Sequence, residues 1–151
     1  MSNDFVDENN SKRHASPDDV YSKTIKKIKE DGVCPFCSDQ LKKYHKNPII
    51  FENDYWLATK NMYPYEGAKV HILIIHKEHI SLIKNINNEG WSNLQNIILK
   101  IQEKFSLKGG SFFIRFGDTK MTGASVSHLH AQLVSPEEEE ENKKPIIVRL
   151  G

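Results

Sequence analysis

The chain has 151 residues, enough for one domain with a substantial hydrophobic core. Its 21 lysine and arginine residues nearly balance 20 aspartate and glutamate residues, so the net charge of +1 gives no broad attraction to nucleic acid or to a membrane surface. No apolar run approaches the length of a membrane span, and the polar N-terminus is unlike a signal peptide, so we expect a cytoplasmic protein.

The N-terminal part of the chain predicts an arm followed by a helix. Residues 1–16 are polar and show no periodicity, so we expect a flexible arm there. Asp18 or Asp19 is placed to cap a helix that runs to about Glu30 and ends at Gly32, because these residue types are favoured at helix termini.

Apolar runs separated by turn residues mark the remaining elements. Strands are expected over residues 48–52, 56–59, 70–76, 111–116 and 126–134, with a further edge strand at 146–150. Asn88 is expected to cap the longest helix, over residues 89–105, whose apolar stripe faces the core. Together with the N-terminal helix, these elements predict an α+β fold with a mainly antiparallel sheet of five to six strands.

The stretch Ser127–Val134 alternates between polar and apolar residues, as a half-buried strand does. On such a strand His128, His130 and Gln132 project to one face, while the apolar residues between them pack on the other. Two imidazoles and an amide on a rigid strand suit a site that binds phosphate or metal, although histidine on a strand is often an ordinary surface residue. We therefore predict an active site on this face.

The turn before this strand is rich in small residues. Gly123, Ala124 and Ser125 are candidates for binding a substrate phosphate, because small residues let the backbone approach a phosphate closely and Ser125 adds a hydroxyl. The alternative is an ordinary turn that binds no ligand.

Two cysteines occur in the chain, as the C-x-x-C pair Cys34 and Cys37. A secreted protein stabilised by disulfides usually has more cysteines at wider spacing, and a thioredoxin-like redox pair follows a strand rather than the charged helix expected here. The spacing suits two thiolate ligands of a tetrahedral zinc ion. Redox chemistry and unligated thiols are the alternatives.

Three blocks of sequence resemble, in their order, the histidine-triad (HIT) superfamily of nucleotidyl hydrolases and transferases. They are Cys34–Cys37, His71–His79 and Thr122–Gln132. The resemblance covers about residues 33–135, and it implies that residues 17–151 form a single HIT-like domain.

The chain departs from the family pattern at two positions. His76 stands where the family usually has proline. Gln132 replaces the last histidine of the triad, and the resulting H-x-H-x-Q form is typical of the branch that includes galactose-1-phosphate uridylyltransferase and the diadenosine tetraphosphate phosphorylases.

The resemblance implies roles for three residues. His130 is the nucleophile that attacks the α-phosphorus of a nucleotide and forms a nucleotidyl-histidine intermediate. Gln132 donates its amide N–H to a phosphate oxygen, but it cannot transfer a proton as a histidine can. His71 corresponds to an additional pocket histidine that contacts a phosphate or the ribose, and a hydrogen-bonded core histidine is the alternative.

The resemblance also implies the remaining ligands of the zinc ion. In zinc-containing relatives two histidines complete the site, and these match His79 and His128 in this chain. His128 then has a structural role close to the nucleophile. His45 is the rival ligand to His79, and His14 is a more distant candidate.

The leading functional hypothesis is an enzyme that hydrolyses or transfers a nucleoside monophosphate group from dinucleoside polyphosphates or related nucleotide conjugates. Water and inorganic phosphate both stay open as acceptors. A nucleotide-binding regulatory module with weak or lost catalysis is the alternative, with Gln132 marking the loss. A third hypothesis is a zinc-stabilised interaction protein or a DNA-end deadenylase like aprataxin, and the balanced charge disfavours nucleic acid as a partner. Family members are commonly homodimers, and the apolar stripe over residues 89–105 permits such an interface.

Overall fold

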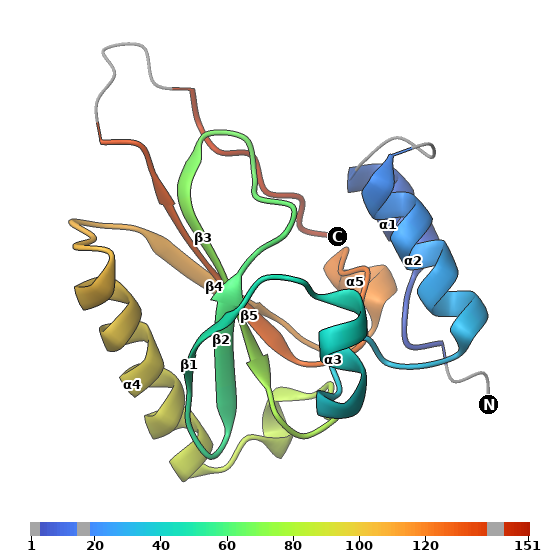
Figure 1. Cartoon of the computed structure of the whole chain (residues 1–151), viewed down its shortest axis with the longest axis horizontal. Helices are drawn as coiled ribbons and strands as arrows, with labels where there is room; N and C mark the ends of the chain where they lie inside the picture. Colours follow the sequence, from blue (N-terminus) through green and yellow to red (C-terminus); the bar gives the residue numbers. More distant parts are fainter. Residues whose placement is uncertain (1–3, 15–18, 139–143) are drawn as a thin grey trace.

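A five-stranded antiparallel sheet forms the centre of the structure (Figure 1). The computed structural model describes residues 4–14, 19–138 and 144–151. The elements in chain order are α1 (Glu8–His14), α2 (Val20–Asp31), α3 (Ser38–Tyr44), β1 (Ile49–Glu52), β2 (Trp56–Lys60), β3 (Ala68–His76), the short 3-10 helix η1 (Ile83–Asn85), α4 (Asn88–Lys104), β4 (Ser111–Arg115), α5 (Thr119–Thr122) and β5 (His130–Pro136). The strand order is β1-β2-β3-β5-β4, and every neighbouring pair is antiparallel. The predicted α+β fold with a mainly antiparallel sheet is therefore confirmed.

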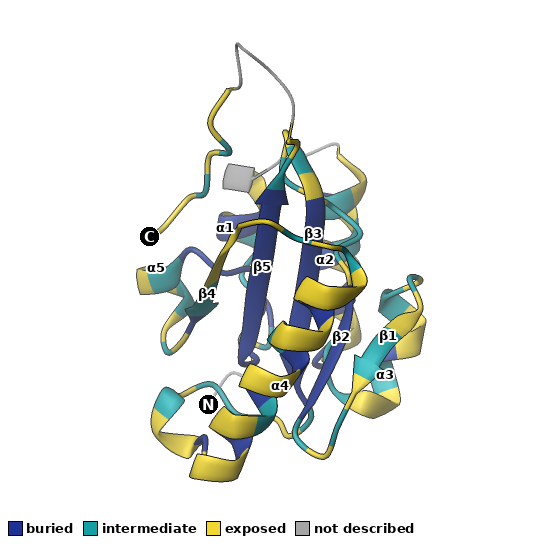
Figure 2. Cartoon of the chain, turned by 90° about the vertical axis from the view of Figure 1, so that its left-hand side faces the viewer, coloured by how far each residue is buried: buried dark blue, intermediate teal, exposed yellow. Residues whose placement is uncertain are grey.

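The sheet is covered on both faces, and β3 is buried because it lies in the middle. On one face Ile72 and Ile74 pack against α4. On the other face Leu73 and Ile75 pack with Leu41 of α3. Figure 2 shows α4 lying across the first face with its outer side exposed, while β3 and β5 are buried behind it. The strand residues on the face opposite α4 are therefore the ones that can line a site there.

The long helix α4 begins one residue earlier than predicted. Asn87 caps it, because its side chain accepts a hydrogen bond from the Gly90 N–H at 2.7 Å, so the prediction of Asn88 as the cap is wrong. The predicted apolar stripe is buried at Leu94 and further along the helix, whereas Trp91 is 39% exposed. No helix in the described part of the chain is long and apolar enough to cross a membrane.

The strand that contains His130 starts later than predicted. β5 begins at His130, whereas the alternation predicted a strand from Val126. Val126 instead pairs with Val6 of the N-terminal segment, and the Leu129 N–H donates to a carbonyl outside the sheet at 2.7 Å. These contacts occupy the backbone groups that a longer β5 would need for its ladder. His128 therefore lies in a bend just before the strand.

The edge strand predicted at residues 146–150 is wrong. This segment contains no strand, and its Arg149 carbonyl accepts a hydrogen bond from Arg115 Nη2 at 2.7 Å. The segment is therefore held to the end of β4 by a side chain rather than by a backbone ladder. Large apolar side chains of this segment are exposed, with Ile147 at 83% and Leu150 at 74%.

Residues 4–14 lie against the fold, in contrast to the flexible arm expected over residues 1–16. Val6 is 3% exposed and forms a β-bridge with Val126, shortly before β5 begins at His130. Composition alone did not reveal this packing, because one buried valine, one buried asparagine and one buried serine in a polar segment give no periodic signal. The other residues of the expected arm lie outside the described ranges.

The helix that was predicted to run to about Glu30 is confirmed as α2. Asp19 caps α2 by accepting a hydrogen bond from the Tyr21 N–H at 2.7 Å, and Gly32 ends the helix in the left-handed conformation with φ of 65°. The short helix α3 follows the cysteine pair and was not predicted, because its polar sequence contains one buried apolar residue, Leu41.

Asn10 ties α1 to the turn before β5. Its buried side-chain amide donates to the carbonyl oxygens of Thr119 at 2.7 Å and of Ala124 at 2.8 Å.

We expect Asn10→Ala to lower the free energy of unfolding by about 2–4 kcal/mol, because two carbonyl groups lose their buried donor. Urea unfolding measures this change, with Lys12→Ala on the exposed side of α1 as the control. A loss for Asn10→Ala no larger than that of the control would contradict the role of these hydrogen bonds.

Candidate active site and metal site

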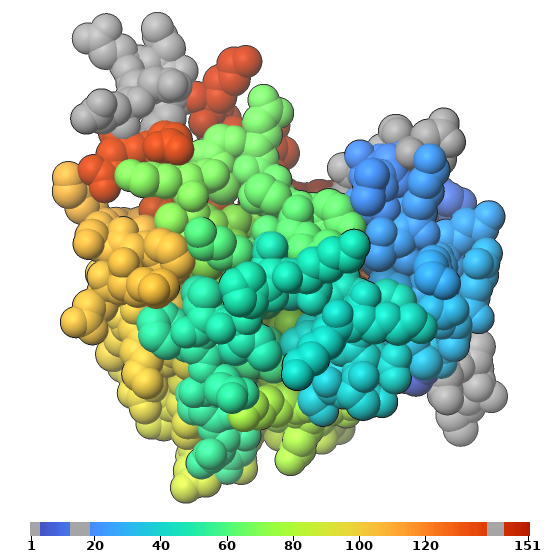
Figure 3. Space-filling view, viewed as in Figure 1, coloured from blue at the N-terminus to red at the C-terminus, as the bar shows by residue number. Residues whose placement is uncertain are grey.

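A cavity of about 1050 Å³ opens on the face of the sheet opposite α4. Its walls come from α2, the loop 61–67, the turn 123–126 and the C-terminal segment 144–149. His130 and Gln132 of β5 belong to its lining, as the alternation predicted. Figure 3 shows the surface hollowed between α2 and the loop that follows β2. The volume lies at the upper end of the usual range for ligand cavities, about 300–1,000 Å³, so it admits a nucleotide-sized ligand.

His130 presents one ring nitrogen that is free to react. Its Nδ1 lies 2.6 Å from the carbonyl oxygen of His128, so Nδ1–H donates to that carbonyl and Nε2 keeps its lone pair. Within the described part of the chain, Nε2 has no hydrogen-bond partner. Burial lowers the pKa of His130 to about 4, and the nearby Arg115 cation adds to that lowering. The imidazole is therefore neutral near pH 7, which is the form that can act as a nucleophile.

Gln132 is held by His71 in one orientation. His71 Nε2 lies 2.6 Å from Gln132 Oε1, and His71 Nδ1 accepts a hydrogen bond from the Tyr65 N–H at 3.1 Å. The Tyr65 contact makes Nδ1 the acceptor, so Nε2–H is the donor to Gln132. The amide oxygen of Gln132 is therefore engaged, and its NH₂ group remains for a ligand. The structure places His71 behind Gln132 and outside the cavity lining, which agrees with the alternative of a hydrogen-bonded core histidine.

The predicted phosphate-binding turn lines the cavity, but part of its backbone is already bonded. Gly123, Ala124 and Ser125 all belong to the lining. The Gly123 N–H donates to the Thr119 carbonyl at 2.9 Å and the Ala124 N–H to Thr122 Oγ1 at 3.1 Å, so these two predicted donors serve the turn itself. Ser125 Oγ is buried, and Tyr21 is its side-chain hydrogen-bonding neighbour among the described residues. Ser125 and Tyr21 both line the cavity.

The structure brings the two cysteines together with two histidines. The ligand atoms of Cys34, Cys37, His79 and His128 all lie within 4.8 Å of one another. Cys34 Sγ lies 3.3 Å from His128 Nδ1, and Cys37 Sγ lies 3.4 Å from His79 Nδ1. Both cysteines are free thiols, so the C-x-x-C pair does not form a disulfide. This cluster can hold a metal ion.

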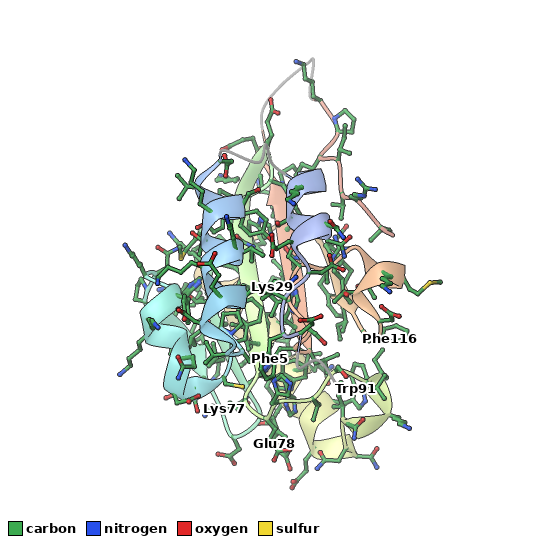
Figure 4. All side chains as sticks on the ribbon, turned by 90° about the vertical axis from the view of Figure 1, so that its right-hand side faces the viewer. Phe5, Lys29, Lys77, Glu78, Trp91 and Phe116 are labelled. Atoms are coloured by element: carbon green, nitrogen blue, oxygen red, sulfur yellow. The ribbon has the colours of Figure 1, made fainter. Side chains whose placement is uncertain are left out.

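Neighbouring groups contact both histidines of the cluster, and a hydrogen bond fixes which nitrogen of His128 faces the cysteines. His128 Nε2 lies 2.7 Å from the His76 carbonyl, so Nε2–H donates there and Nδ1 offers its lone pair to the cluster. Phe5, which is labelled in Figure 4, lies in the segment before α1. Its ring packs edge-on against His79 with centroids 5.4 Å apart. The rival ligand His45 lies elsewhere, with Nε2 2.8 Å from Thr59 Oγ1. The side chain of His14 lies outside the described residues.

The segment that contains His130, Gln132 and the metal-ligand cluster matches a known family. A family model described as "Scavenger mRNA decapping enzyme C-term binding" matches residues 33–146. An uncharacterized HIT-like protein of Helicobacter pylori is 30% identical over 86 residues, which are 57% of this chain and 81% of that protein. The chain belongs to the HIT family.

Solved structures of HIT proteins share this fold. One described as "Hit Like Protein" has a TM-score of 0.53 at 27% identity, and the match covers 64% of this chain and 93% of that chain. A HIT family hydrolase from Clostridium thermocellum has a TM-score of 0.50 at 29% identity, and the match covers 68% of this chain and 90% of that chain. These likenesses confirm the HIT-like fold predicted from the sequence blocks.

The cavity of this HIT protein has polar lining residues that were not predicted from sequence, Arg115 and Tyr21 among them. Arg115, the last residue of β4, is 7% exposed and is the register partner of His130. Tyr21 of α2 reaches the same cavity, and its ring contacts Tyr63 at 4.8 Å between centroids. The available signal for Arg115 was a charged residue directly after the apolar run Phe112–Ile114. Tyr21 gave no signal, because its position depends on how α2 packs.

We expect His71 to stay neutral at pH values where an ordinary histidine is protonated. Burial lowers the pKa of His71 below its ordinary value of 6.5, and the hydrogen bond to Gln132 raises it only in part. The folded state thus favours the neutral ring, and this contribution to stability is present above pH 6.5 and lost as the pH falls. NMR of the ring nitrogens measures both the tautomer and the pKa, with the urea-unfolded chain as reference. Titration of His71 at or above the pKa of the unfolded chain would contradict the buried contact with Gln132.

Proposed function

We propose that this HIT protein is a nucleotidyl hydrolase or nucleotidyltransferase that acts on dinucleoside polyphosphates or related nucleotide conjugates through a nucleotidyl-His130 intermediate. One observation carries the proposal: His130 lines the cavity with Nδ1 bonded to the His128 carbonyl at 2.6 Å, so Nε2 is the nitrogen available for attack. Gln132 and Ser125 line the same cavity with polar groups suited to phosphate oxygen atoms.

The chemistry proceeds in two displacements. The Nε2 lone pair attacks the α-phosphorus, a P–N bond forms, and the P–O bond to the leaving group breaks with its electron pair on oxygen. An oxygen of water or inorganic phosphate then attacks the phosphorus, and the P–N electron pair returns to Nε2. When water is the acceptor, its proton leaves to solvent or to a product phosphate.

Gln132 shapes which substrates suit this site. Its NH₂ group can donate to non-bridging phosphate oxygens as the phosphorus becomes five-coordinate. It cannot give a proton to the leaving group, so the site favours leaving groups that are stable as anions, such as a phosphate or a nucleotide. This supports dinucleoside polyphosphates over conjugates with a poorly leaving amine.

We also propose that the cluster of Cys34, Cys37, His79 and His128 binds zinc. Zinc bonds of about 2.3 Å to sulfur and about 2.0–2.1 Å to nitrogen place tetrahedral ligand atoms roughly 3.4–3.8 Å apart. The separation of 3.4 Å between Cys37 Sγ and His79 Nδ1 lies in this range. The separations from His128 Nδ1, 3.3 Å to Cys34 Sγ, 3.2 Å to His79 Nδ1 and 3.9 Å to Cys37 Sγ, lie just outside it, so small shifts of these side chains would complete the site. The metal then joins the cysteine pair to the residues just before β5, and it supports His130 without entering the reaction.

The nucleophile is tested by His130→Ala. We expect kcat on diadenosine polyphosphates to fall by at least about a thousandfold, because the proposed nucleophile is removed. Wild-type protein mixed rapidly with labelled substrate and quenched should carry one labelled nucleotide on His130, identified by mass spectrometry. Mass analysis of products with and without inorganic phosphate distinguishes phosphorolysis, which gives ADP, from hydrolysis, which gives AMP.

The comparison is valid if His130→Ala has the same thermal-unfolding temperature and the same metal content as the wild type. Normal turnover by that folded variant would refute the mechanism. Binding of nucleotides without turnover of any of them, in the wild type, would instead support the regulatory module with lost catalysis.

The metal site is tested by substituting two of its four proposed ligands. We expect the purified protein to contain about one zinc ion per chain, and we expect Cys37→Ala and His79→Ala to lose it. Removal by a chelator should lower the unfolding temperature, because binding to the folded state contributes to its stability. His45→Asn is the control and should retain the metal, since His45 bonds to Thr59 instead. Loss of zinc in His45→Asn but not in His79→Ala would reverse the ligand assignment.

A further inference from the structure

The segment 144–151 runs along the edge of the cavity as an extended chain. It passes the loop between β2 and β3 and ends beside α5 (Figure 1). A Cβ added at Gly67 would lie 3.5 Å from Ile146 Cγ1, and one added at Gly123 would lie 3.2 Å from the Gly151 backbone nitrogen. The segment therefore reaches from one wall of the cavity to another.

A side-chain hydrogen bond attaches the end of this segment to β4. Arg115 Nη2 donates to the Arg149 carbonyl at 2.7 Å. None of the backbone hydrogen bonds among the described residues joins the segment 144–151 to a strand or a helix. The part that precedes Arg149 can therefore shift without breaking any secondary structure.

The side chains of the segment alternate between the cavity and the body of the protein, as in an extended chain. Pro145, Ile147 and Arg149 line the cavity. Ile146 and Val148, which lie between them, are half-buried. Ile147 therefore faces the cavity from a segment that no backbone ladder holds.

Ile147 is an apolar side chain that lines the cavity and still contacts water. It is 83% exposed. An apolar side chain gains free energy when it leaves water, so a ligand that covers Ile147 would stabilise it there. Leu150 of the same segment is 74% exposed and does not belong to the cavity lining. The two residues thus share their exposure and differ in their position relative to the cavity.

We propose that residues 144–151 form a strap that closes over a nucleotide in the cavity, and that Ile147 packs on the nucleoside part of this ligand. An apolar side chain packs favourably on a base or a sugar ring, whereas it would desolvate phosphate oxygens without bonding to them. A ligand moves a segment only through contacts that differ between its two positions, and Ile147 supplies such a contact. Closure then shields the bound nucleotide from water, as the lids of other enzymes do. This inference rests on the proposed function in taking the ligand to be a nucleotide.

A matched pair of serine substitutions tests the strap by calorimetric titration with AMP. We expect Ile147→Ser to weaken AMP binding by about five- to tenfold, because its packing on the nucleoside is lost. Leu150→Ser is the control and should stay within about twofold of wild type, since Leu150 does not line the cavity. Ile147→Val keeps an apolar side chain and should retain most of the affinity. Both positions are exposed, so these substitutions leave the fold intact.

Hydrogen exchange of the full chain measures closure directly. We expect the amides of residues 146–151 to exchange at least about tenfold more slowly with saturating AMP than without it, because the closed strap is ordered. The amides of α4, which covers the other face of the sheet, are the reference and should not change. The slowing should be smaller in Ile147→Ser than in Leu150→Ser.

Equal AMP affinities of Ile147→Ser and Leu150→Ser, or exchange of the strap that AMP does not change, would overturn the strap. Either result leaves the proposed function standing if the wild type still turns over nucleotides through His130. A strap that AMP protects through Ile147, in a protein that turns over no nucleotide, would instead refute the proposed function and keep the strap. Wild-type protein that binds neither AMP nor diadenosine tetraphosphate would overturn both.

Discussion

The antiparallel pairing of β3 with β5 positions both candidate sites of this HIT protein. Its register sets Ile75 opposite His130 and Leu73 opposite Gln132. Side chains alternate between the two faces of a strand, so a shift of one residue would turn His130 and Gln132 toward α4 and away from the cavity. The apolar residues of β3, buried on both faces, make such a shift costly because each of them would change its packing.

The candidate catalytic site and the candidate metal site meet in the backbone of residues 128–130. The His128 side chain faces the metal cluster, while its carbonyl accepts the Nδ1–H of His130 at 2.6 Å. The last residue of β3 completes this link, because the His76 carbonyl accepts the Nε2–H of His128 at 2.7 Å. A metal ion that fixes His128 therefore also fixes the carbonyl that orients the proposed nucleophile.

The N-terminal part of the chain contributes to the site although it precedes the family match, which begins at residue 33. Val6 pairs with Val126, and Asn10 bonds to the carbonyl of Ala124 at 2.8 Å, so this part braces the turn next to His130. α2 then forms a wall of the cavity with Tyr21 among its lining residues. Elements that precede the family match thus shape the cavity of this chain.

The sequence by itself determined the main strands and the capped helix α2. It also determined the cysteine pair and the face of β5 that bears His130 and Gln132. Alternation, capping residues and short spacings are local properties, so the sequence alone contains them. The blocks that resemble the HIT family added His79 and His128, which the structure brings to the cysteines. Only the tertiary structure showed that His79 rather than His45 lies beside the cysteines, that β5 starts at His130, that His71 contacts Gln132 and that Arg115 is buried. Each of these depends on which distant segments pack together, and local periodicity contains no information on contacts between residues far apart in the chain.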